Sequence, residues 1–285
     1  MTESEMQWWP APAKINLFLH VLARRSDGYH DIQTLFQLLD WGDEIGILPT
    51  DEEGIRRHDV SYGVPESEDL VTRAAHLLQS ETACRRGAVI AVRKRVPPGS
   101  GLGGGSSDAA TVLRVLNRLW GCGMDIDGLS ALGRRLGADV PVFVRGHSAM
   151  AQGVGEKLEP VSLGRRHYIL VFPDLQISTA KIFAAAGLKR DTKPISLEEA
   201  LREQGKNDCE PVVRQRYPGF DQLMRTLEKW GAPRMTGTGS GIFIRMHDEK
   251  SAKSAAQALK SLYNVRAVQG VDISPLHAKL DCLIE

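Results

Sequence analysis

A glycine-rich segment that runs directly into a helical pattern constrains the fold more than any other feature of this chain. Residues 99–105 read Gly-Ser-Gly-Leu-Gly-Gly-Gly. Behind them, apolar side chains recur at three- and four-residue spacing, at Ala109, Val112, Leu113, Leu116, Leu119 and Trp120. This spacing predicts an amphipathic helix, with Ser106 or Ser107 as its N-cap. The glycine segment is therefore expected to end at a helix N-terminus.

Such a segment favours the binding of an anion. Glycine lets the backbone approach a ligand and turn its N–H groups toward it, and a helix N-terminus carries roughly half a positive charge. Phosphate is the commonest ligand of this arrangement. A flexible surface linker is the alternative, and the two serines and the well-patterned helix argue against it.

Two familiar nucleotide loops fit the segment poorly. Residues 99–104 match the dinucleotide pattern G-x-G-x-x-G letter for letter. That pattern also requires an acidic residue at the end of the next strand, about 20 residues on, where this chain has a helix end and the segment 122–127. The P-loop pattern is absent, because Gly205-Lys206 is followed by Asn207 and has no glycine at the required spacing. The sequence therefore points to a third kind of nucleotide loop.

Strand and helix patterns alternate along the chain, which predicts an α+β protein. Strands are expected at 15–21, 35–39, 44–48, 88–92, 168–172, 233–235 and 241–246, and helices at 69–79, 109–120, 127–136, from Thr179 and from Ser196. Asp127 is the expected cap of the helix at 127–136, and Ser196 and Glu199 have the spacing of a capping box. The glycine-interrupted stretch 148–155 is the expected boundary between two domains, residues 1–155 and 156–285.

Composition narrows the class of protein. Lys and Arg number 36 against 35 Asp and Glu, so the chain lacks the broad basic surface of a nucleic-acid binder. No apolar run approaches the ~20 residues that span a bilayer, and the polar first residues do not resemble a signal peptide. Four widely spaced cysteines indicate neither a disulfide framework nor a structural metal site. We therefore expect a cytoplasmic protein with no nucleic-acid or membrane partner.

The motif Pro-x-x-x-Gly-Leu-Gly-Gly-Gly-Ser-Ser, beginning at Pro97, resembles the nucleotide loop of the GHMP kinases. Five further motifs, in order along the chain, are similar to the members of that superfamily that act on 4-diphosphocytidyl-2-C-methyl-D-erythritol. They are Pro12–Leu17, Asp27–His30, Leu136–Pro141, Asn207–Glu210 and Thr236–Gly239. The resemblance extends from about Pro10 to Pro275.

This resemblance implies a fold and an activity. The fold is a two-domain GHMP kinase fold with a ribosomal-protein-S5-like N-terminal domain and a ferredoxin-like C-terminal domain, and the active site lies between them. The activity is ATP-dependent transfer of the γ-phosphoryl group to the 2-hydroxyl of the methylerythritol unit, in the non-mevalonate route to isoprenoid precursors. Mg²⁺ is inferred from the chemistry, and its ligands are not identifiable from the sequence.

Lys14 and Asp139 are the expected catalytic residues. The resemblance implies that Asp139 accepts the proton of the attacking hydroxyl. Lys14 lies in an apolar alternating strand, where a charge is costly unless it is paired. Paired with Asp139, it would keep that carboxylate ionised and orient the hydroxyl. A turn aspartate and a strand-end lysine in solvent are the alternatives.

The resemblance implies that main-chain N–H groups of the glycine segment surround the ATP phosphates. The expected nucleotide-binding residues are Lys94, Pro97, Gly99, Gly101, Leu102, Gly103, Gly104, Gly105, Ser106 and Ser107. One of the two serine hydroxyls is expected to reach Mg²⁺ or a phosphate oxygen. Lys94 lies near the adenine by resemblance, and a solvated basic strand end is its alternative. We expect no ligand role for Asp108, which reads as first-turn stabilisation of a helix.

Cytidine recognition is likewise implied by the resemblance. Tyr29 and Phe183 match residues whose rings sandwich the cytosine, and His30 matches one that hydrogen-bonds its edge. Asn16 and Thr179 match further substrate contacts. Without the resemblance, Tyr29 and His30 would read as turn residues and Phe183 as a core position.

The chain departs from the family pattern before Leu70, because Glu68-Asp69-Leu70 lacks the asparagine that the family has near the adenine. Recognition of adenine is therefore less defined than recognition of phosphate. Two other functions remain open at this point. One is another small-alcohol GHMP kinase, acting for example on mevalonate or homoserine. The other is a silent nucleotide- or RNA-binding module, which the near-zero net charge disfavours.

Overall fold

The computed structural model describes residues 3–58, 65 and 68–282, and within them one mixed sheet contains ten strands. The elements of the N-terminal half are the 3₁₀ helix η1 (Glu3–Glu5), β1 (Gln7–Arg24), β2 (His30–Thr50), β3 (Ile55–Arg57), α1 (Leu70–Thr82), β4 (Gly87–Arg93), α2 (Gly104–Leu119), α3 (Ile126–Arg134), α4 (Val140–Arg145), β5 (Ala149–Gly153) and β6 (Lys157–Pro160).

The C-terminal half adds strands β7 to β10 to the same sheet, together with further helices. They are β7 (Arg166–Phe172), α5 (Thr179–Phe183), α6 (Leu197–Leu201), α7 (Glu210–Arg216), α8 (Pro218–Leu227), the 3₁₀ helix η2 (Glu228–Trp230), β8 (Pro233–Met235), β9 (Ile242–Met246), α9 (Glu249–Leu259), β10 (Asn264–Val271) and α10 (Pro275–Asp281). The strand order is β3-β4-β2-β10-β7-β9-β8, with β1 and β5 also paired to β2. The alternation predicted from the sequence is therefore present.

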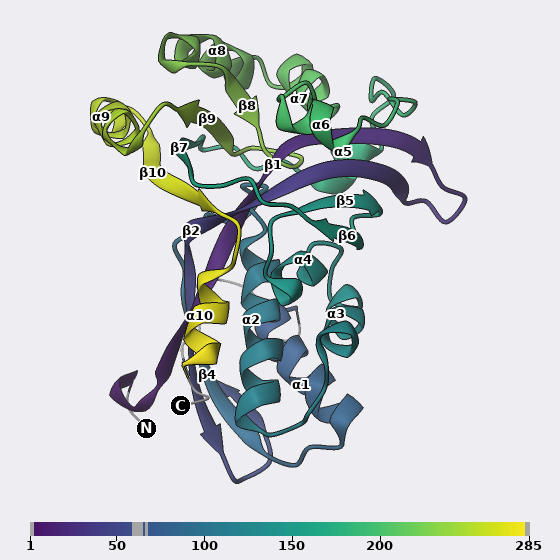
Figure 1. The fold of residues 1–285 in the computed structure, drawn as a ribbon, viewed down its shortest axis with the longest axis vertical. Helices are drawn as coiled ribbons and strands as arrows, with labels where there is room; N and C mark the ends of the chain where they lie inside the picture. The colour runs from purple at the N-terminus through teal and green to yellow at the C-terminus, as the bar shows by residue number, and fades with distance from the viewer. Residues whose placement is uncertain (1–2, 59–64, 66–67, 283–285) are drawn as a thin grey trace.

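Two long antiparallel strands, β1 and β2, run through both halves of the molecule (Figure 1). Their pairing shifts register between Pro12 and Lys14, between Asn16 and Leu19, and between Val21 and Ala23. Such bulges bend a strand and redirect its side chains, and they are common beside active sites. Lys14 directly follows the first of these shifts, and Asn16 directly precedes the second.

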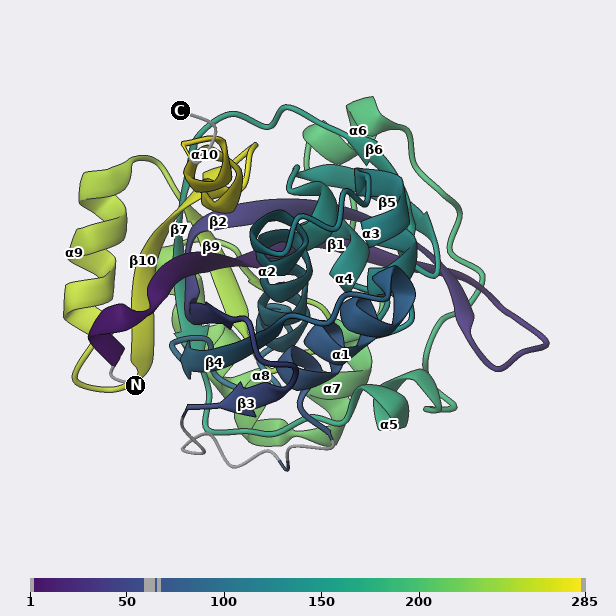
Figure 2. The same cartoon turned by 90° about the horizontal axis from the view of Figure 1, so that it is seen from below.

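Helices α1 to α4 cover one face of the sheet in the N-terminal half, with α2 at the centre (Figure 2). Its apolar face is fully buried through Val112, Leu113 and Leu116, as the spacing predicted. Burial of each such side chain contributes about 1.5–3 kcal/mol. The last helix, α10, returns to this core through Leu276 and Leu280, whereas Leu19 of β1 packs into the core of the C-terminal half.

Helix starts differ from the sequence predictions at two places. Helix α2 begins at Gly104 with Gly103 as its N-cap, because Gly103 has φ of 75° and the Ser107 hydroxyl bonds elsewhere. Helix α3 is capped by Asp125, which accepts from the Gly128 N–H, rather than by Asp127. The capping box at Ser196 is confirmed.

In the described part of the chain, no helix is long and apolar enough to cross a membrane. The four cysteines are free. The boundary predicted at residue 155 remains a prediction, because the sheet continues from one half into the other.

Candidate active site

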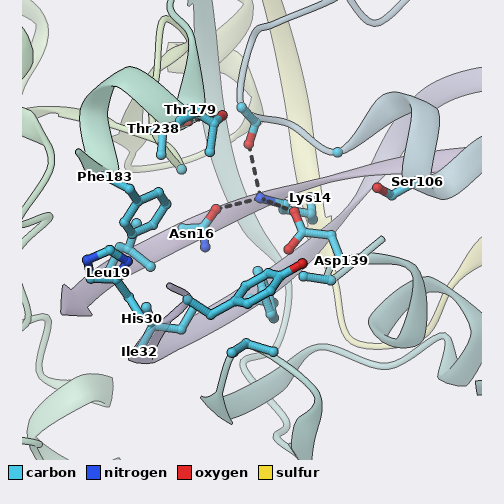
Figure 3. Close-up of a pocket in the computed structure, with 18 of the residues that line it drawn as sticks. Lys14, Asn16, Leu19, His30, Ile32, Ser106, Asp139, Thr179, Phe183 and Thr238 are labelled. Carbon is cyan, nitrogen blue, oxygen red and sulfur yellow. Dashed lines mark hydrogen bonds and ion pairs between the residues drawn. The ribbon is translucent and has the colours of Figure 1, made fainter. Parts of the chain in front are cut away.

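A cavity of about 660 Å³ lies between the glycine segment and α5. Figure 3 shows the residues that line it, among them Lys14, Asn16, His30, Asp139 and Phe183. A second cavity of about 390 Å³ lies on the other side of the glycine segment. Gly101, Gly103 and Ser106 line both. Two ligands bound in these cavities would therefore meet at the glycine segment.

The Lys14 ammonium lies at the centre of the larger cavity's polar wall (Figure 3). It is buried, and it lies 3.1 Å from Asp139 Oδ2 while donating to Asn16 Oδ1 at 2.6 Å and to the Gly101 carbonyl at 3.0 Å. An ammonium has three donors, so these three acceptors satisfy it. The ion pair predicted between Lys14 and Asp139 is thus present, and Lys14 does not reach into solvent.

Asp139 is the N-cap residue of the short helix α4 and has its side chain 35% exposed. Asp139 lies after the end of α3, as the helix predicted at 127–136 implied, and Val140-Pro141 then begins the new helix α4. Its carboxylate faces the cavity and forms an ion pair with the Lys14 ammonium. A partly exposed carboxylate held in this way is available to a hydroxyl in the cavity.

Asn16 connects the first strand to the C-terminal half. Its amide donates to Thr34 Oγ1 at 2.9 Å, its Oδ1 accepts from Lys14, and its backbone N–H donates to Thr236 Oγ1 at 2.9 Å. The side chain lines the cavity. Asn16 therefore holds Lys14 in place whether or not it contacts a ligand.

The glycine segment is clamped by the turn at 236–241. Ser240 N–H donates to the Gly99 carbonyl and Gly241 N–H to the Ser100 carbonyl. Gly101 has φ of 73°, and a Cβ there would lie 2.4 Å from the Thr236 carbonyl oxygen. Only glycine fits such an approach. The two turns, from opposite halves of the chain, thus form one unit.

The motif Asn207–Glu210 supports that turn. Asn207 Nδ2 donates to the carbonyls of Met235 and Gly237, and Glu210 Oε2 accepts from the Met235 N–H. These contacts fix the last residue of β8 and the start of the turn. The motif therefore acts on the site through the turn.

The smaller cavity contains a buried charge cluster. Lys94 Nζ lies 2.5 Å from Asp43 Oδ2 and 2.8 Å from Asp108 Oδ2, and both carboxylates are almost fully buried. Burial raises the pKa of Asp108 to about 8 against the attraction of Lys94, and the charge of Asp43 acts in the same direction. For Lys94, burial is outweighed by the two carboxylates, so its pKa is raised. The ammonium is thus tied to the protein.

Aromatic side chains lie at the far end of the larger cavity. The rings of His30 and Phe183 are stacked, with centroids 5.0 Å apart and planes 29° from parallel. Tyr29 lines the same cavity and is 63% exposed. Thr179 and Thr238 share a hydrogen bond of 2.8 Å between their hydroxyls. We call Tyr29, His30 and Phe183 the base end of the cavity.

Family models match the chain in two segments. The GHMP kinases N terminal domain matches residues 69–147 and the GHMP kinases C terminal domain matches residues 184–265. The 4-diphosphocytidyl-2-C-methyl-D-erythritol kinase of Alkalilimnicola ehrlichii is 48% identical over 96% of this chain and 96% of its own. The kinase of the same name from Halorhodospira halophila is 48% identical over 97% of both chains.

The chain belongs to the 4-diphosphocytidyl-2-C-methyl-D-erythritol kinase family. A crystal structure of 4-(cytidine 5'-diphospho)-2C-methyl-D-erythritol kinase matches with a TM-score of 0.81 and 34% identity, over 93% of this chain and all of that one. Homoserine kinase from Cytophaga hutchinsonii has the same fold, with a TM-score of 0.69 at 18% identity. The predicted α+β GHMP kinase fold is therefore confirmed, and with it a phosphotransferase family that uses ATP.

Most of the residues that the family resemblance singled out lie at the two cavities. The larger cavity is lined by Lys14, Asn16, Tyr29, His30, Asp139, Thr179 and Phe183, and the smaller by Lys94, Pro97, Gly99, Gly104 and Gly105. Two side chains point elsewhere. Leu102 is buried in an apolar cluster, and the Ser107 hydroxyl donates to the Pro12 carbonyl at 2.6 Å. Ser106 is therefore the serine whose hydroxyl can face a ligand.

The first-turn position expected for Asp108 was wrong. It lies one turn into α2 and is held by Lys94, so it does not act at the first turn of the helix. Sequence reasoning also missed Asp43, which accepts from Lys94 and from the N–H groups of Arg95 and Val96. Asp43 lies between Gly42 and Glu44, so no isolated charge marked it in the sequence.

Proposed function

We propose that this chain catalyses ATP-dependent phosphorylation of the 2-hydroxyl of 4-diphosphocytidyl-2-C-methyl-D-erythritol, a step toward isoprenoid precursors. One observation carries the proposal. The Lys14–Asp139 pair lines a cavity that begins at the glycine segment and ends at the aromatic base end. Family membership supplies the substrate, since the relatives are named for that reaction.

In the proposed reaction the 2-hydroxyl oxygen attacks the γ-phosphorus of ATP. The bond from that phosphorus to the β,γ-bridging oxygen breaks, ADP leaves with the bond's electron pair, and the hydroxyl proton passes to Asp139. Lys14 keeps the carboxylate oriented through its 3.1 Å contact and faces the developing negative charge. Because Gly101 and Gly103 line both cavities, their backbone lies where the two reactants meet.

The nucleotide is proposed to occupy the smaller cavity, with the N–H groups at the start of α2 toward its phosphates. Mg²⁺ would supply charge neutralisation there when bound. The described residues contain no group of three His, Cys, Asp or Glu side chains that could hold a metal. This fits a Mg²⁺ held mainly by phosphate oxygens and water. The Ser106 hydroxyl, which lines both cavities, is the proposed protein ligand.

An ADP-release assay tests this function. Mg-ATP is supplied with 4-diphosphocytidyl-2-C-methyl-D-erythritol, and parallel reactions contain mevalonate, homoserine or no acceptor. We expect turnover with the cytidyl compound alone. Turnover with another alcohol and none with the cytidyl compound would keep the kinase chemistry and reject the proposed substrate. A cytoplasmic location and the absence of a nucleic-acid partner remain predictions from composition.

A further inference from the structure

Arg190 lies against the base end and was not singled out by the sequence. Its Nε donates to His30 Nε2 at 3.2 Å. Its remaining contacts are backbone carbonyls, at 3.1 Å to Leu188, 2.8 Å to Phe183 and 2.8 Å to Ala185. Four of the five N–H groups of the guanidinium are thus occupied, so its orientation is fixed.

This contact determines the protonation of His30. A guanidinium has donors and no acceptor, and it stays charged in proteins. The His30 nitrogen that faces it must therefore present a lone pair. In a neutral imidazole the proton then resides on Nδ1. Among the described residues, Nδ1 has no hydrogen-bond partner, and His30 lines the cavity.

We propose that Arg190 fixes His30 as the neutral tautomer protonated on Nδ1, so that the base end offers a donor and selects cytosine over uracil. This inference rests on the proposed function for its ligand. N3 of cytosine is an acceptor, whereas N3 of uracil carries a hydrogen. A histidine free to exchange tautomers could serve either base, but a fixed donor opposes the N3–H of uracil.

The stacked ring cannot supply this discrimination, because stacking on an aromatic face tolerates every base. Specificity of the base end must then come from its polar edge, and His30 carries the ring nitrogens there. Phe183 contributes its carbonyl to Arg190 and its ring to His30. Arg190 is thus a positioning residue that aligns both members of the stack.

The charges around His30 act in the same direction. The pKa of His30 is lowered below its ordinary value of 6.5. Burial is the largest cause, and the positive charges of Arg190 and of Arg24 on β1 lower it further. Phe183, from α5, presents an apolar face. The imidazole therefore stays neutral at neutral pH, as the contact with Arg190 requires.

The tautomer is measurable without substrate or turnover. In wild-type protein with ¹⁵N-labelled histidine, the His30 ring signals are assigned by comparison with the His30→Gln variant. We expect the shifts of a neutral ring with the proton on Nδ1. A ring protonated on Nε2, a doubly protonated ring at pH 7, or an even mixture of tautomers would overturn the proposal.

The selectivity is tested with Arg190→Met, and Arg216→Met is the matched control. Arg216, on α7, donates to the carbonyl of Lys181, which lies in α5 with Phe183. Its recorded hydrogen bond does not involve His30. For Arg190→Met we expect the ratio of kcat/KM for the cytidyl substrate over its uridyl analogue to fall about tenfold or more. In the same variant the pKa of His30 should lie closer to 6.5. Below pH 6.5, the rise in KM for the cytidyl substrate should be larger than the fall in kcat.

The control should keep the wild-type ratio and the wild-type titration of His30. If Arg190→Met also keeps both, the proposal is overturned. If Arg190→Met does not fold, the ring spectrum of the wild-type protein still decides the tautomer. If the wild-type protein turns over neither compound, the proposed function fails, and that result is separate from the spectrum.

Discussion

Two lysine centres flank the glycine segment and differ in what surrounds the ammonium. Lys14 contacts one carboxylate and two neutral oxygens, and that carboxylate, on Asp139, is 35% exposed to the larger cavity. Lys94 contacts two carboxylates that are almost entirely buried. A carboxylate open to a cavity can exchange a proton with a ligand, whereas buried carboxylates must be held by the protein. The Lys14 centre is therefore suited to proton transfer with a ligand, and the Lys94 centre to stabilising the fold.

The sharpest test of this difference is Asp139→Asn. The amide keeps the shape and removes the proton acceptor, so kcat is expected to fall about 10²- to 10⁴-fold. ATP affinity, measured by calorimetry, should change little, because Asp139 does not line the smaller cavity. A loss of ATP affinity with unchanged kcat would remove Asp139 from its proposed role.

Lys14→Met should have the next largest effect on turnover. It removes the ammonium from Asp139 and leaves the oxygens of Asn16 and Gly101 without their donor. We expect kcat to fall about 10²-fold or more and the free energy of unfolding to drop by about 1–3 kcal/mol. Steady-state kinetics and urea denaturation measure the two effects. Wild-type kcat in a folded variant would contradict the comparison.

Lys94→Met should lower the stability of the fold more than Lys14→Met does and lower kcat less. It leaves Asp43 and Asp108 together without their cation, and loss of one partner of a buried pair costs about 3–5 kcal/mol. The folded fraction should retain a larger share of wild-type kcat than Lys14→Met does. If Lys94→Met is as stable as the wild-type protein, the assignment of Lys94 to structure is wrong.

The smallest expected effect is the pH dependence of Asp108→Asn. The folded pKa of Asp108, about 8, lies above the ordinary value of 3.8, so the folded state binds the extra proton between these values. Wild-type stability from this group therefore falls as pH rises from about 4 to 8. Asparagine has no proton to release, so the stability of the variant relative to wild type should improve as the pH rises over that range. Urea denaturation at pH 5.5 and pH 8 measures it, and a constant difference would contradict it.

Much of the fold could be predicted from the sequence, because the strongest sequence signals come from residues close together in the chain. The apolar spacing from Ala109 to Trp120 predicts α2, since one helical face packs against one sheet. The N-cap of that helix could not be predicted in the same way. Ser107 bonds to the Pro12 carbonyl, which is distant in the sequence, and that partner is visible only in three dimensions.

The candidate site was predictable where a family motif or an isolated charge marked it. Lys14 in an apolar strand signalled a partner, and the motif at Leu136–Pro141 supplied Asp139. Asp43 and Arg190 carry no such mark. Their partners, Lys94 and His30, come from other parts of the chain, and Arg190 lies in an irregular segment among many surface arginines.

The pairing of β1 with β2 extends through both halves of this protein and connects them mechanically. A rotation of one half against the other would have to bend this ribbon, because no linker separates its two ends. The ribbon can yield most readily where its register is irregular, and two of those positions adjoin Lys14 and Asn16. The positions where the ribbon bends most easily thus lie beside the residues that would hold a substrate. Ligand binding is then expected to stiffen the whole molecule from its centre.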